Sequence, residues 1–288
     1  MTEDVAYVCQ LTGEEREYAA INLNEQDETR AKNIAEIKEW LNKNDDLISR
    51  TDDFFILRFL RTCKFDIERT KRRLRNYHEQ RTNSPEWFLN RDPLLLEMQE
   101  FFNMGVFLPL KKPDNEGRMV IIIRCTAHDP SRHEFHDLFK ACLMILELAV
   151  RQNESVSLHG IIAILDMSGA SIGHALQLPP AVIKKVVHAW QGCYPVRVRS
   201  MDFVNAPLYV NVVLKIFKKF MTPKLKQRVH IHFSDVKTVL SKLPPEIIPI
   251  EYGGTEDTLQ DLKTYWKQIV EENRTWLMDD EKYKAAAR

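Results

Sequence analysis

From Met119 onward, strand-sized apolar runs alternate with stretches of helical periodicity, and this alternation limits the fold more than any other feature. The four runs span residues 119–125, 160–166, 199–206 and 228–233. Helical patterns separate them, and a helix of ten or more residues is long enough to connect neighbouring parallel strands. The pattern therefore predicts an α/β domain built on a mostly parallel sheet.

The first half of the chain is predicted to be helical. Glu25–Leu41 carries an apolar stripe at helical spacing, and Asp66 is placed to cap another helix that runs to about Arg81. Pro85 interrupts this pattern. We therefore expect an acidic N-terminal tail at 1–24, a helical domain at 25–95, the α/β domain at 96–275 and a C-terminal tail at 276–288.

Apolar stretches and cysteines indicate the compartment. No stretch reaches the 18 uninterrupted apolar residues of a membrane span, and the N-terminus lacks the basic and apolar segments of a signal peptide. The five cysteines are scattered and never spaced as Cys-x-x-Cys, which is typical of reduced thiols rather than of disulfides or a zinc site. These features predict a cytoplasmic protein.

The charges are unevenly distributed, although the 41 basic and 41 acidic side chains cancel. Residues 184–230 hold ten Lys and Arg against one acid, Asp202, a balance of +9, whereas residues 1–28 hold eight acids and one Arg, a balance of −7. A basic face suits anionic lipid headgroups or nucleic acid, and the alternative is an ordinary solvated surface. Few aromatic residues accompany the basic block, and no recognition motif does, so we do not expect nucleic acid as a partner.

Motifs for catalysis and cofactors are weak. No glycine-rich loop is spaced to hold a dinucleotide or a nucleoside triphosphate. His128, His133 and His136 are irregularly spaced, and we expect no metal site and no cofactor. Asp166, Ser168 or Ser171, and His174 contain the groups of a hydrolase triad, but the Gly-x-Ser-x-Gly elbow is missing. The sequence predicts a protein that is not an enzyme.

The segment Pro207–Phe220 is apolar on nearly every face except for Asn211 and three lysines. A surface helix normally has one apolar stripe. A helix that is apolar on two sides either is buried between two layers or covers a cavity and also meets a bilayer, where lysines can reach the headgroups. Periodicity alone leaves both interpretations open.

Several short motifs resemble those of the CRAL-TRIO lipid-transfer family, and they occur in the family's order. They are Phe55–Arg61, Lys64–Asp66, Val120–Arg124, Asp129-Pro130, Leu165–Gly169, Tyr194–Arg199, Asn205–Pro207, and Leu243-Pro244 followed by Glu251–Gly254. The resemblance covers roughly residues 25–275 and is closest to the branch of the α-tocopherol transfer and retinaldehyde-binding proteins. It implies the family's N-terminal helical domain, an α/β domain with one lipid cavity, and a mobile lid helix.

The resemblance also implies ligand-binding positions, with the lid at residues 205–221. They are Phe139, Cys142, Leu146, Ile161, Leu165, Val186, Ala189, Trp190, Tyr194, Val196, Met201, Val210, Val213, Ile216 and Met221. Cys142 and Leu146 stand where the tocopherol protein has serines that help to receive the ligand's hydroxyl. This departure leaves tocopherol, retinoids and other terpenoids as candidate ligands.

Four phosphoinositide-binding positions of the branch fall on basic residues, namely Arg197, Arg199, Lys224 and Arg228. A fifth basic position falls on Cys63, and Arg61 and Lys64 are the neighbours that could replace its charge. The resemblance therefore implies a cytoplasmic carrier that binds one hydrophobic molecule, associates reversibly with anionic membranes and releases its ligand with help from phosphoinositides. The alternative is a phospholipid- or phosphoinositide-sensing membrane adaptor.

Overall fold

The computed structural model describes residues 6–233 and 236–287. Its first part is helical, and Asp52 and Asp66 cap two of the helices by accepting hydrogen bonds from the backbone N–H groups of Phe55 and Arg69. The helices are α1 (Gly13–Leu23), α2 (Asp27–Asn42), α3 (Asp53–Cys63), α4 (Ile67–Asn83), α5 (Pro85–Phe88) and α6 (Leu96–Met104).

A five-stranded sheet in the order β1-β2-β3-β4-β5 forms the centre of the second part. Its strands are β1 (Phe107–Pro109), β2 (Met119–Arg124), β3 (Ile161–Asp166), β4 (Val198–Val204) and β5 (Val229–Ile231). Strands β2 to β5 pair in parallel, which confirms the predicted α/β class, and β1 pairs antiparallel with β2. The short strand β1 was not predicted, because three residues show no readable alternation.

Helices connect and cover the sheet. They are α7 (Phe135–Gln152), α8 (Glu154–His159), α9 (Ile172–Leu176), α10 (Pro180–His188), α11 (Val210–Phe220), α12 (Pro223–Lys226), α13 (Val236–Leu240), α14 (Leu259–Glu272) and α15 (Arg274–Asp279). The strands β2 to β5 follow one another across the sheet, so right-handed crossovers place the connecting helices on one face. Helices α10 and α11 contact each other there, and a π-helical turn, Ala189–Cys193, extends α10.

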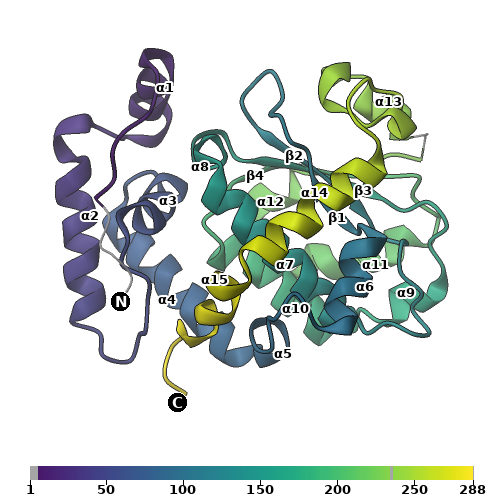
Figure 1. Cartoon of the computed structure of the whole chain (residues 1–288), viewed down its shortest axis with the longest axis horizontal. Coiled ribbons are helices and arrows are strands. Elements are labelled where there is room, and N and C mark those ends of the chain that lie inside the picture. The colour runs from purple at the N-terminus through teal and green to yellow at the C-terminus, as the bar shows by residue number, and fades with distance from the viewer. Residues whose placement is uncertain (1–5, 234–235, 288) are drawn as a thin grey trace.

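One apolar core extends through both parts of the chain, and α5 of the first part packs on α7 of the second (Figure 1). The core includes Phe59 of α3, Trp87 of α5, Ile121 of β2 and Leu148 of α7, all fully buried. The helical part and the α/β part therefore pack as one body, and they do not have separate cores.

Both predicted tails are packed against the molecule, apart from residues 1–5 and Arg288, which lie outside the described residues. At the N-terminus, Thr12 and Glu15 form a capping box that starts α1, and Ala19 and Leu23 pack on Leu158. At the C-terminus, α14 is followed by α15, whose Leu277 is fully buried. Each of the two segments thus contributes buried apolar side chains.

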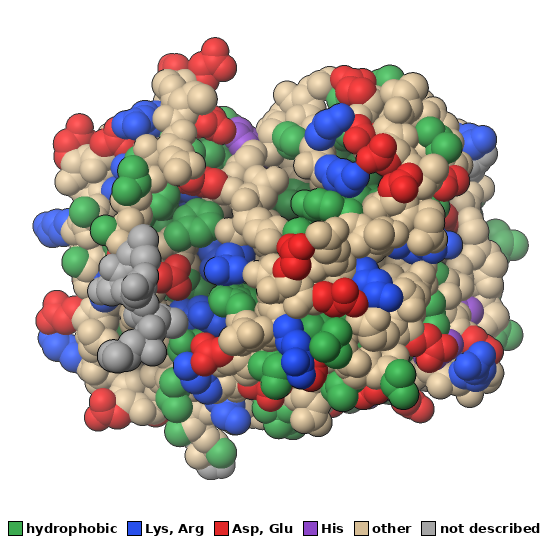
Figure 2. Space-filling view, viewed as in Figure 1, with side chains coloured by type: hydrophobic (Ala, Val, Ile, Leu, Met, Phe, Trp, Pro, Cys, Tyr) green, Lys and Arg blue, Asp and Glu red, His purple; other side chains and the backbone are tan. Residues whose placement is uncertain are grey.

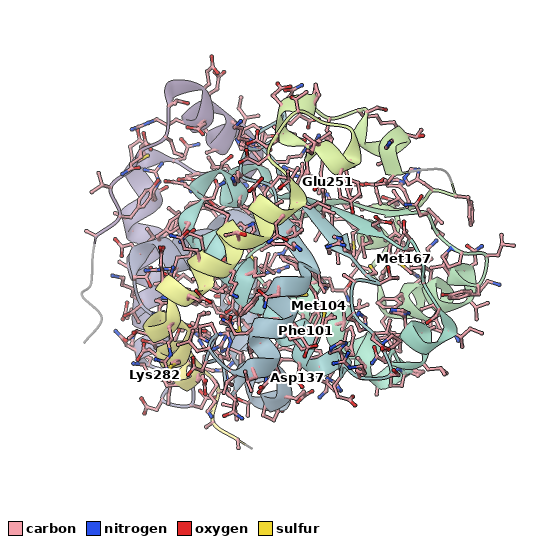
Figure 3. The ribbon with its side chains drawn as sticks, turned by 45° about the vertical axis from the view of Figure 1, so that its right-hand side comes forward. Phe101, Met104, Asp137, Met167, Glu251 and Lys282 are labelled. Carbon is pink, nitrogen blue, oxygen red and sulfur yellow. The ribbon has the colours of Figure 1, made fainter. Side chains whose placement is uncertain are left out.

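A buried ionic network holds the C-terminal segment to the helical part. Asp280, 2% exposed, accepts hydrogen bonds from Arg50 at 2.8 Å, Arg81 at 2.6 Å and Arg91 at 2.9 Å. Glu147 of α7 pairs with Arg81 at 3.3 Å and also with Arg91. Figure 3 shows this end of the chain near Lys282, on the side opposite Met167.

The outer surface in the orientation of Figure 1 carries interspersed charges. Figure 2 shows acidic and basic side chains mixed across this face, with small apolar patches between them. Helix α14 crosses it and packs on α6, whose Phe101 and Met104 lie beside it (Figure 3). This face therefore shows no single block of basic charge.

Candidate ligand cavity and adjoining basic cluster

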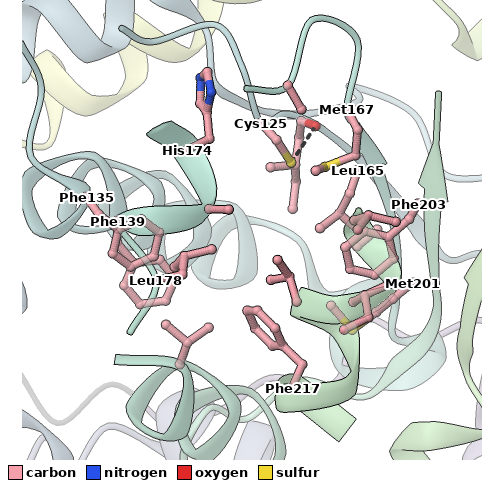
Figure 4. A pocket seen from close by; sticks show the side chains of 18 of the residues that line it. Cys125, Phe135, Phe139, Leu165, Met167, His174, Leu178, Met201, Phe203 and Phe217 are labelled. Atoms are coloured by element: carbon pink, nitrogen blue, oxygen red, sulfur yellow. Dashed lines mark hydrogen bonds between the residues drawn. The ribbon is translucent and has the colours of Figure 1, made fainter. Parts of the chain in front are cut away.

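An apolar cavity lies between the sheet and helices α7, α10 and α11. Its sheet side is formed by residues two apart on each strand, because alternate side chains share one face. They are Ile123 on β2 and Cys125 just after it, Ala163 and Leu165 on β3 and Met167 just after it, and Met201 and Phe203 on β4. Figure 4 shows Leu165, Met201 and Phe203 facing Phe135 and Phe139 of α7, with Phe217 of α11 between the two sides.

The cavity is large enough for more than solvent. The centre of a water molecule can move through about 200 Å³ of it, whereas one buried water needs roughly 10–15 Å³. Its wall is almost entirely apolar, and Phe135 and Phe139 stack with ring centroids 5.5 Å apart. Apolar walls of this size favour an extended hydrophobic molecule.

Nine of the fifteen predicted ligand-binding residues line this cavity. They are Phe139, Cys142, Leu165, Val186, Trp190, Met201, Val210, Val213 and Met221. They come from α7, β3, α10 with its π-helical turn, β4, and the α11 segment. The tertiary fold thus brings together residues that are up to 82 positions apart, from Phe139 to Met221.

The other six predicted residues are placed elsewhere: Leu146, Ile161, Ala189, Tyr194, Val196 and Ile216. Leu146 lies one helical turn beyond Cys142 in the packed core, and Ile161 is at the start of β3, away from the carboxyl end that borders the cavity. The Tyr194 hydroxyl donates to Glu147 at 2.8 Å, so its ring belongs to the buried ionic network.

Several residues that line the cavity were not predicted, although their spacing from predicted residues could have indicated them. Met167 follows Leu165 by two positions and Phe203 follows Met201 by two, which puts each pair on one strand face. Phe135 precedes Phe139 by four and Phe217 follows Val213 by four, which puts each pair on one helix face. Val106 and Phe107, in contrast, reach the cavity from the unpredicted strand β1.

Helix α11 presents one apolar face to the cavity and other apolar side chains to the surface. Val210 and Leu214 are 2% exposed and line the cavity. On the outer side, Val212 is 63% exposed, and Leu208, two residues before the helix, is 83% exposed. Of the two interpretations left open by periodicity, the cavity-covering helix matches this arrangement, whereas a helix buried between two layers does not.

The polar side chains in the wall are partly paired, and Nδ1 of His128 and the hydroxyl of Tyr209 are buried without a hydrogen-bond partner among the described residues. Gln177 donates to the carbonyls of Pro130 and His133, and its own oxygen lies 3.0 Å from Nε2 of His128. His174 pairs with Ser171 at 2.8 Å and with the His128 carbonyl at 3.2 Å. Burial lowers the pKa of His128 and raises the pKa of Cys125 to about 12, so both groups are neutral near pH 7.

The groups of the hydrolase triad have separate partners. Asp166 accepts hydrogen bonds from Ser168 at 2.6 Å, Asn205 at 2.9 Å and Tyr252 at 3.0 Å, whereas His174 pairs with Ser171 and a backbone carbonyl. Asp166 therefore fixes the loop after β3 and does not orient His174. Within residues 6–233 and 236–287, no group of three His, Cys, Asp or Glu side chains is arranged to hold a metal ion.

The four predicted headgroup residues lie at the beginning of β4 and after α11. Arg197 donates to the carbonyls of Ser157 and Leu158, which are at the C-terminal end of α8. Arg199 donates to the carbonyl of His159 at 2.7 Å, and Arg228 donates to that of Val198. Carbonyls at the end of a helix stabilise cations but leave their charge uncompensated.

The charged neighbours of these residues are mainly other cations. Burial, and after it Arg199, lowers the pKa of Arg197 to about 10. Burial and then Arg228, Arg69 and Lys64 lower the pKa of Lys224, and burial and then Arg199 lower that of Arg228. We call Lys64, Arg69, Arg197, Arg199, Lys224 and Arg228 the basic cluster. It extends across both parts of the molecule and is chemically suited to a polyanion.

The structure distinguishes the two candidates for the charge missing at Cys63. Arg61 is fully buried and pairs with Glu25 at 2.7 Å and Glu154 at 2.8 Å, so its charge is already neutralised. Lys64 is exposed, and its positive charge helps to lower the pKa of Lys224. Of the two, only Lys64 belongs to the basic cluster.

No helix in the part of the chain described here is both long and apolar enough to cross a membrane. A mostly parallel sheet with an apolar cavity under a short amphipathic helix defines a protein that can enclose a small hydrophobic molecule. The family model described as the CRAL/TRIO domain matches residues 103–254, and that of the Pinta-like UBA domain matches residues 26–98. The chain belongs to the CRAL/TRIO family, which confirms the resemblance seen in the motifs.

Several relatives match most of the chain. An "Alpha-tocopherol transfer protein-like" protein of Mus musculus is 33% identical over 254 residues, 88% of this chain and 73% of its own length. "Clavesin-1" of Xenopus laevis is 30% identical over 249 residues, covering 85% and 74% respectively. The solved structure "Crystal structure of Sfh5" has a TM-score of 0.56 at 14% identity, covers 93% of this chain and 99% of its own, and shares the fold.

Proposed function

We propose that the protein is an intracellular carrier for one small hydrophobic ligand, which it takes up and delivers at membranes without covalent chemistry. The apolar cavity beneath α11 is the observation that carries this proposal. Proteins of the same family include relatives named for tocopherol transfer, which is consistent with such a role. We further propose that it works in the cytoplasm and docks reversibly on anionic membranes.

The energetics of the cavity are compatible with reversible exchange. Removing about 600 Å² of a terpenoid from water would contribute roughly 15 kcal/mol at 25 cal/mol per Å². A bilayer offers the ligand a comparable gain, so the difference between the two sites is small. The carrier can therefore load from one membrane and unload into another.

Helix α11 is the proposed lid. It lines the cavity on one side, exposes Val212 on the other just after the exposed Leu208, and has Lys218 and Lys219 in its last turn. Exposed apolar side chains next to lysines suit the interface of an anionic bilayer. Lys224 and Arg228 follow α11 directly, so a headgroup bound to them could favour an open position of the lid.

The wall supports a mainly apolar ligand, and its polar atoms without a partner are Nδ1 of His128 and the hydroxyl of Tyr209 among the described residues. His128, His174 and Gln177 use hydrogen-bonding groups on one another, and the thiols of Cys125 and Cys142 are neutral because burial raises their pKa. Cys142 lines the cavity, whereas Leu146 does not, so one of the two departures from the tocopherol protein bears on the ligand. Tocopherol, retinoids and other terpenoids all remain within the proposed class.

The test begins with organic extraction of the purified protein and mass spectrometry of what is released. A terpenoid supports the carrier, whereas a phospholipid supports a sensing adaptor, the second candidate, which the basic cluster favours. Transfer of fluorescent retinol or tocopherol between vesicles then tests function. In Ala163→Phe, a ring would enter the cavity from its sheet side, and we expect lost ligand uptake with an unchanged melting temperature in ligand-free buffer. Unchanged uptake by this variant would contradict the cavity assignment.

A further inference from the structure

The acidic helix α1 packs on α8, and the backbone carbonyls at the end of α8 accept hydrogen bonds from Arg197 and Arg199 of the basic cluster. The hydroxyl of Tyr18 accepts a hydrogen bond of 2.8 Å from Nη2 of Arg199, and its ring packs on His159 with centroids 4.4 Å apart. Arg199 thus donates from Nε to the carbonyl of His159 and from Nη2 to Tyr18. A phosphate that binds both terminal nitrogens of Arg199 would compete with the Tyr18 hydroxyl for Nη2.

The charge of α1 opposes an incoming anion. Gly13–Leu23 contains Glu14, Glu15 and Glu17 against Arg16, a balance of −2. Glu15 is close enough to His159 to favour its charged form, although burial lowers the pKa of His159 more strongly. An anionic headgroup approaching this edge therefore meets like charge as well as the phenol of Tyr18.

Helix α1 is held by few apolar contacts. Leu11, Ala19, Leu23 and Leu158 form a small cluster that is separate from the main core. The Arg16–Asp27 ion pair is about half exposed on both sides, and such pairs stabilise little. Segments with few buried apolar contacts are the ones that open locally.

The chain on either side of α1 is anchored more firmly. Before it, Arg61 donates to the Tyr7 hydroxyl at 3.2 Å, and the Tyr7 backbone N–H donates to Asp53 at 2.8 Å. After it, Glu25 is 2% exposed and bound by Arg61. Asn24, between α1 and this anchor, has a left-handed backbone (φ 58°), and its amide donates to the carbonyl of Lys64 at 3.2 Å. Helix α1 thus spans two fixed points and borders the basic cluster at both Lys64 and Arg199.

We infer that α1 is an autoinhibitory flap that competes with an anionic headgroup for Arg199. The inference rests on the proposed headgroup site and adds a regulatory element to it. By reciprocity, whatever weakens the docking of α1 strengthens headgroup binding, and a bound headgroup loosens α1. The acidic N-terminal segment then sets the threshold of anionic charge at which the carrier engages a membrane.

The experiment compares full-length wild type with Tyr18→Phe, which removes the hydroxyl and keeps the ring. Binding is measured to phosphatidylcholine vesicles with and without a few per cent of a bisphosphorylated phosphoinositide. We expect Tyr18→Phe to bind the phosphoinositide vesicles roughly three- to tenfold more tightly, which corresponds to about 0.7–1.4 kcal/mol. Tyr265→Phe, on the distant helix α14, is the matched control and should behave as wild type. Hydrogen exchange of the α1 amides in wild type should accelerate when these vesicles are added.

The outcomes separate the flap from the headgroup site. If wild type binds phosphoinositide vesicles but Tyr18→Phe binds them equally or more weakly, the flap is refuted and the headgroup site stands. Unchanged exchange of α1 on binding would refute the flap as well. If neither protein distinguishes the two kinds of vesicle, the proposed headgroup site itself fails, and the flap fails with it.

Discussion

Asp280 offers the sharpest test of how the C-terminal segment is held. Its carboxylate is 2% exposed and accepts hydrogen bonds from Arg50, Arg81 and Arg91. In Asp280→Asn, Arg81 and Arg91 keep Glu147 as an acidic partner, and Arg50 keeps only Asp279, 4.0 Å away. The net charge of the three arginines with Glu147 and residue 280 rises from +1 to +2. Removing one partner of a buried ion pair typically costs about 3–5 kcal/mol.

This loss is large beside a typical stability of about 5–15 kcal/mol. With an unfolding entropy of about 2.1 cal/mol/K per residue over 288 residues, it corresponds to a melting temperature lower by about 5–8 °C. Circular dichroism and calorimetry of delipidated protein measure the shift, because a bound ligand would raise both melting temperatures. Asp279→Asn is the control: its carboxylate is 39% exposed, pairs with Lys282 at 2.5 Å and lies 4.0 Å from Arg50, at the limit of an ion pair, so we expect little change.

The pH dependence gives a second check on the same residue. The surrounding arginines lower the pKa of Asp280 to about 2 despite its burial, whereas an unfolded aspartate titrates near about 3.9. A depressed carboxyl pKa stabilises the folded state above the unfolded value, and this contribution is lost as the pH falls toward 2. The advantage of wild type over Asp280→Asn should therefore be constant above about pH 5 and shrink between about pH 4 and pH 2. Equal melting of Asp280→Asn and Asp279→Asn at pH 7 would refute the reasoning.

Three further predictions concern the site. Val213→Asp places a buried, unpaired carboxylate where α11 meets the cavity, so fluorescent retinoid or tocopherol should bind at least tenfold more weakly; normal folding with unchanged affinity would show that α11 is not the lid. The double variant Arg197→Ala, Arg228→Ala should abolish the stimulation of ligand transfer by phosphoinositide vesicles, since each basic residue near an anionic membrane contributes about 1 kcal/mol. Its affinity for the hydrophobic ligand in lipid-free buffer should stay normal, and a lost affinity would show that the two arginines have a structural role instead. Ser168→Ala and His174→Ala should leave the bound ligand chemically unchanged after long incubation, as in wild type; lipid-ester hydrolysis that disappears in these variants would reveal an enzyme.

Local sequence patterns determined much of the fold. Alternating apolar runs predicted the parallel strands β2 to β5, and the cap at Asp66 predicted the start of α4, because hydrogen-bonding and side-chain periodicity act within a few residues. Leu165 and Met201 were predicted from the family resemblance instead, and the pairing of β3 with β4 puts both on the cavity face of the sheet.

Only the tertiary structure decided which part of each strand or helix borders the cavity, and which basic side chains are neutralised by an acidic partner. Ile161 and Leu165 share a strand face, yet one lies in the packed core and the other lines the cavity, since periodicity specifies direction and not depth. From the sequence, Arg61 and Lys64 are equally good replacements for the basic charge missing at Cys63. The structure pairs Arg61 with Glu25, 36 positions away, and so neutralises the charge of Arg61. Asp280 likewise meets its arginines across 189 to 230 positions. Such contacts depend on how distant segments pack, which no local pattern of residues encodes.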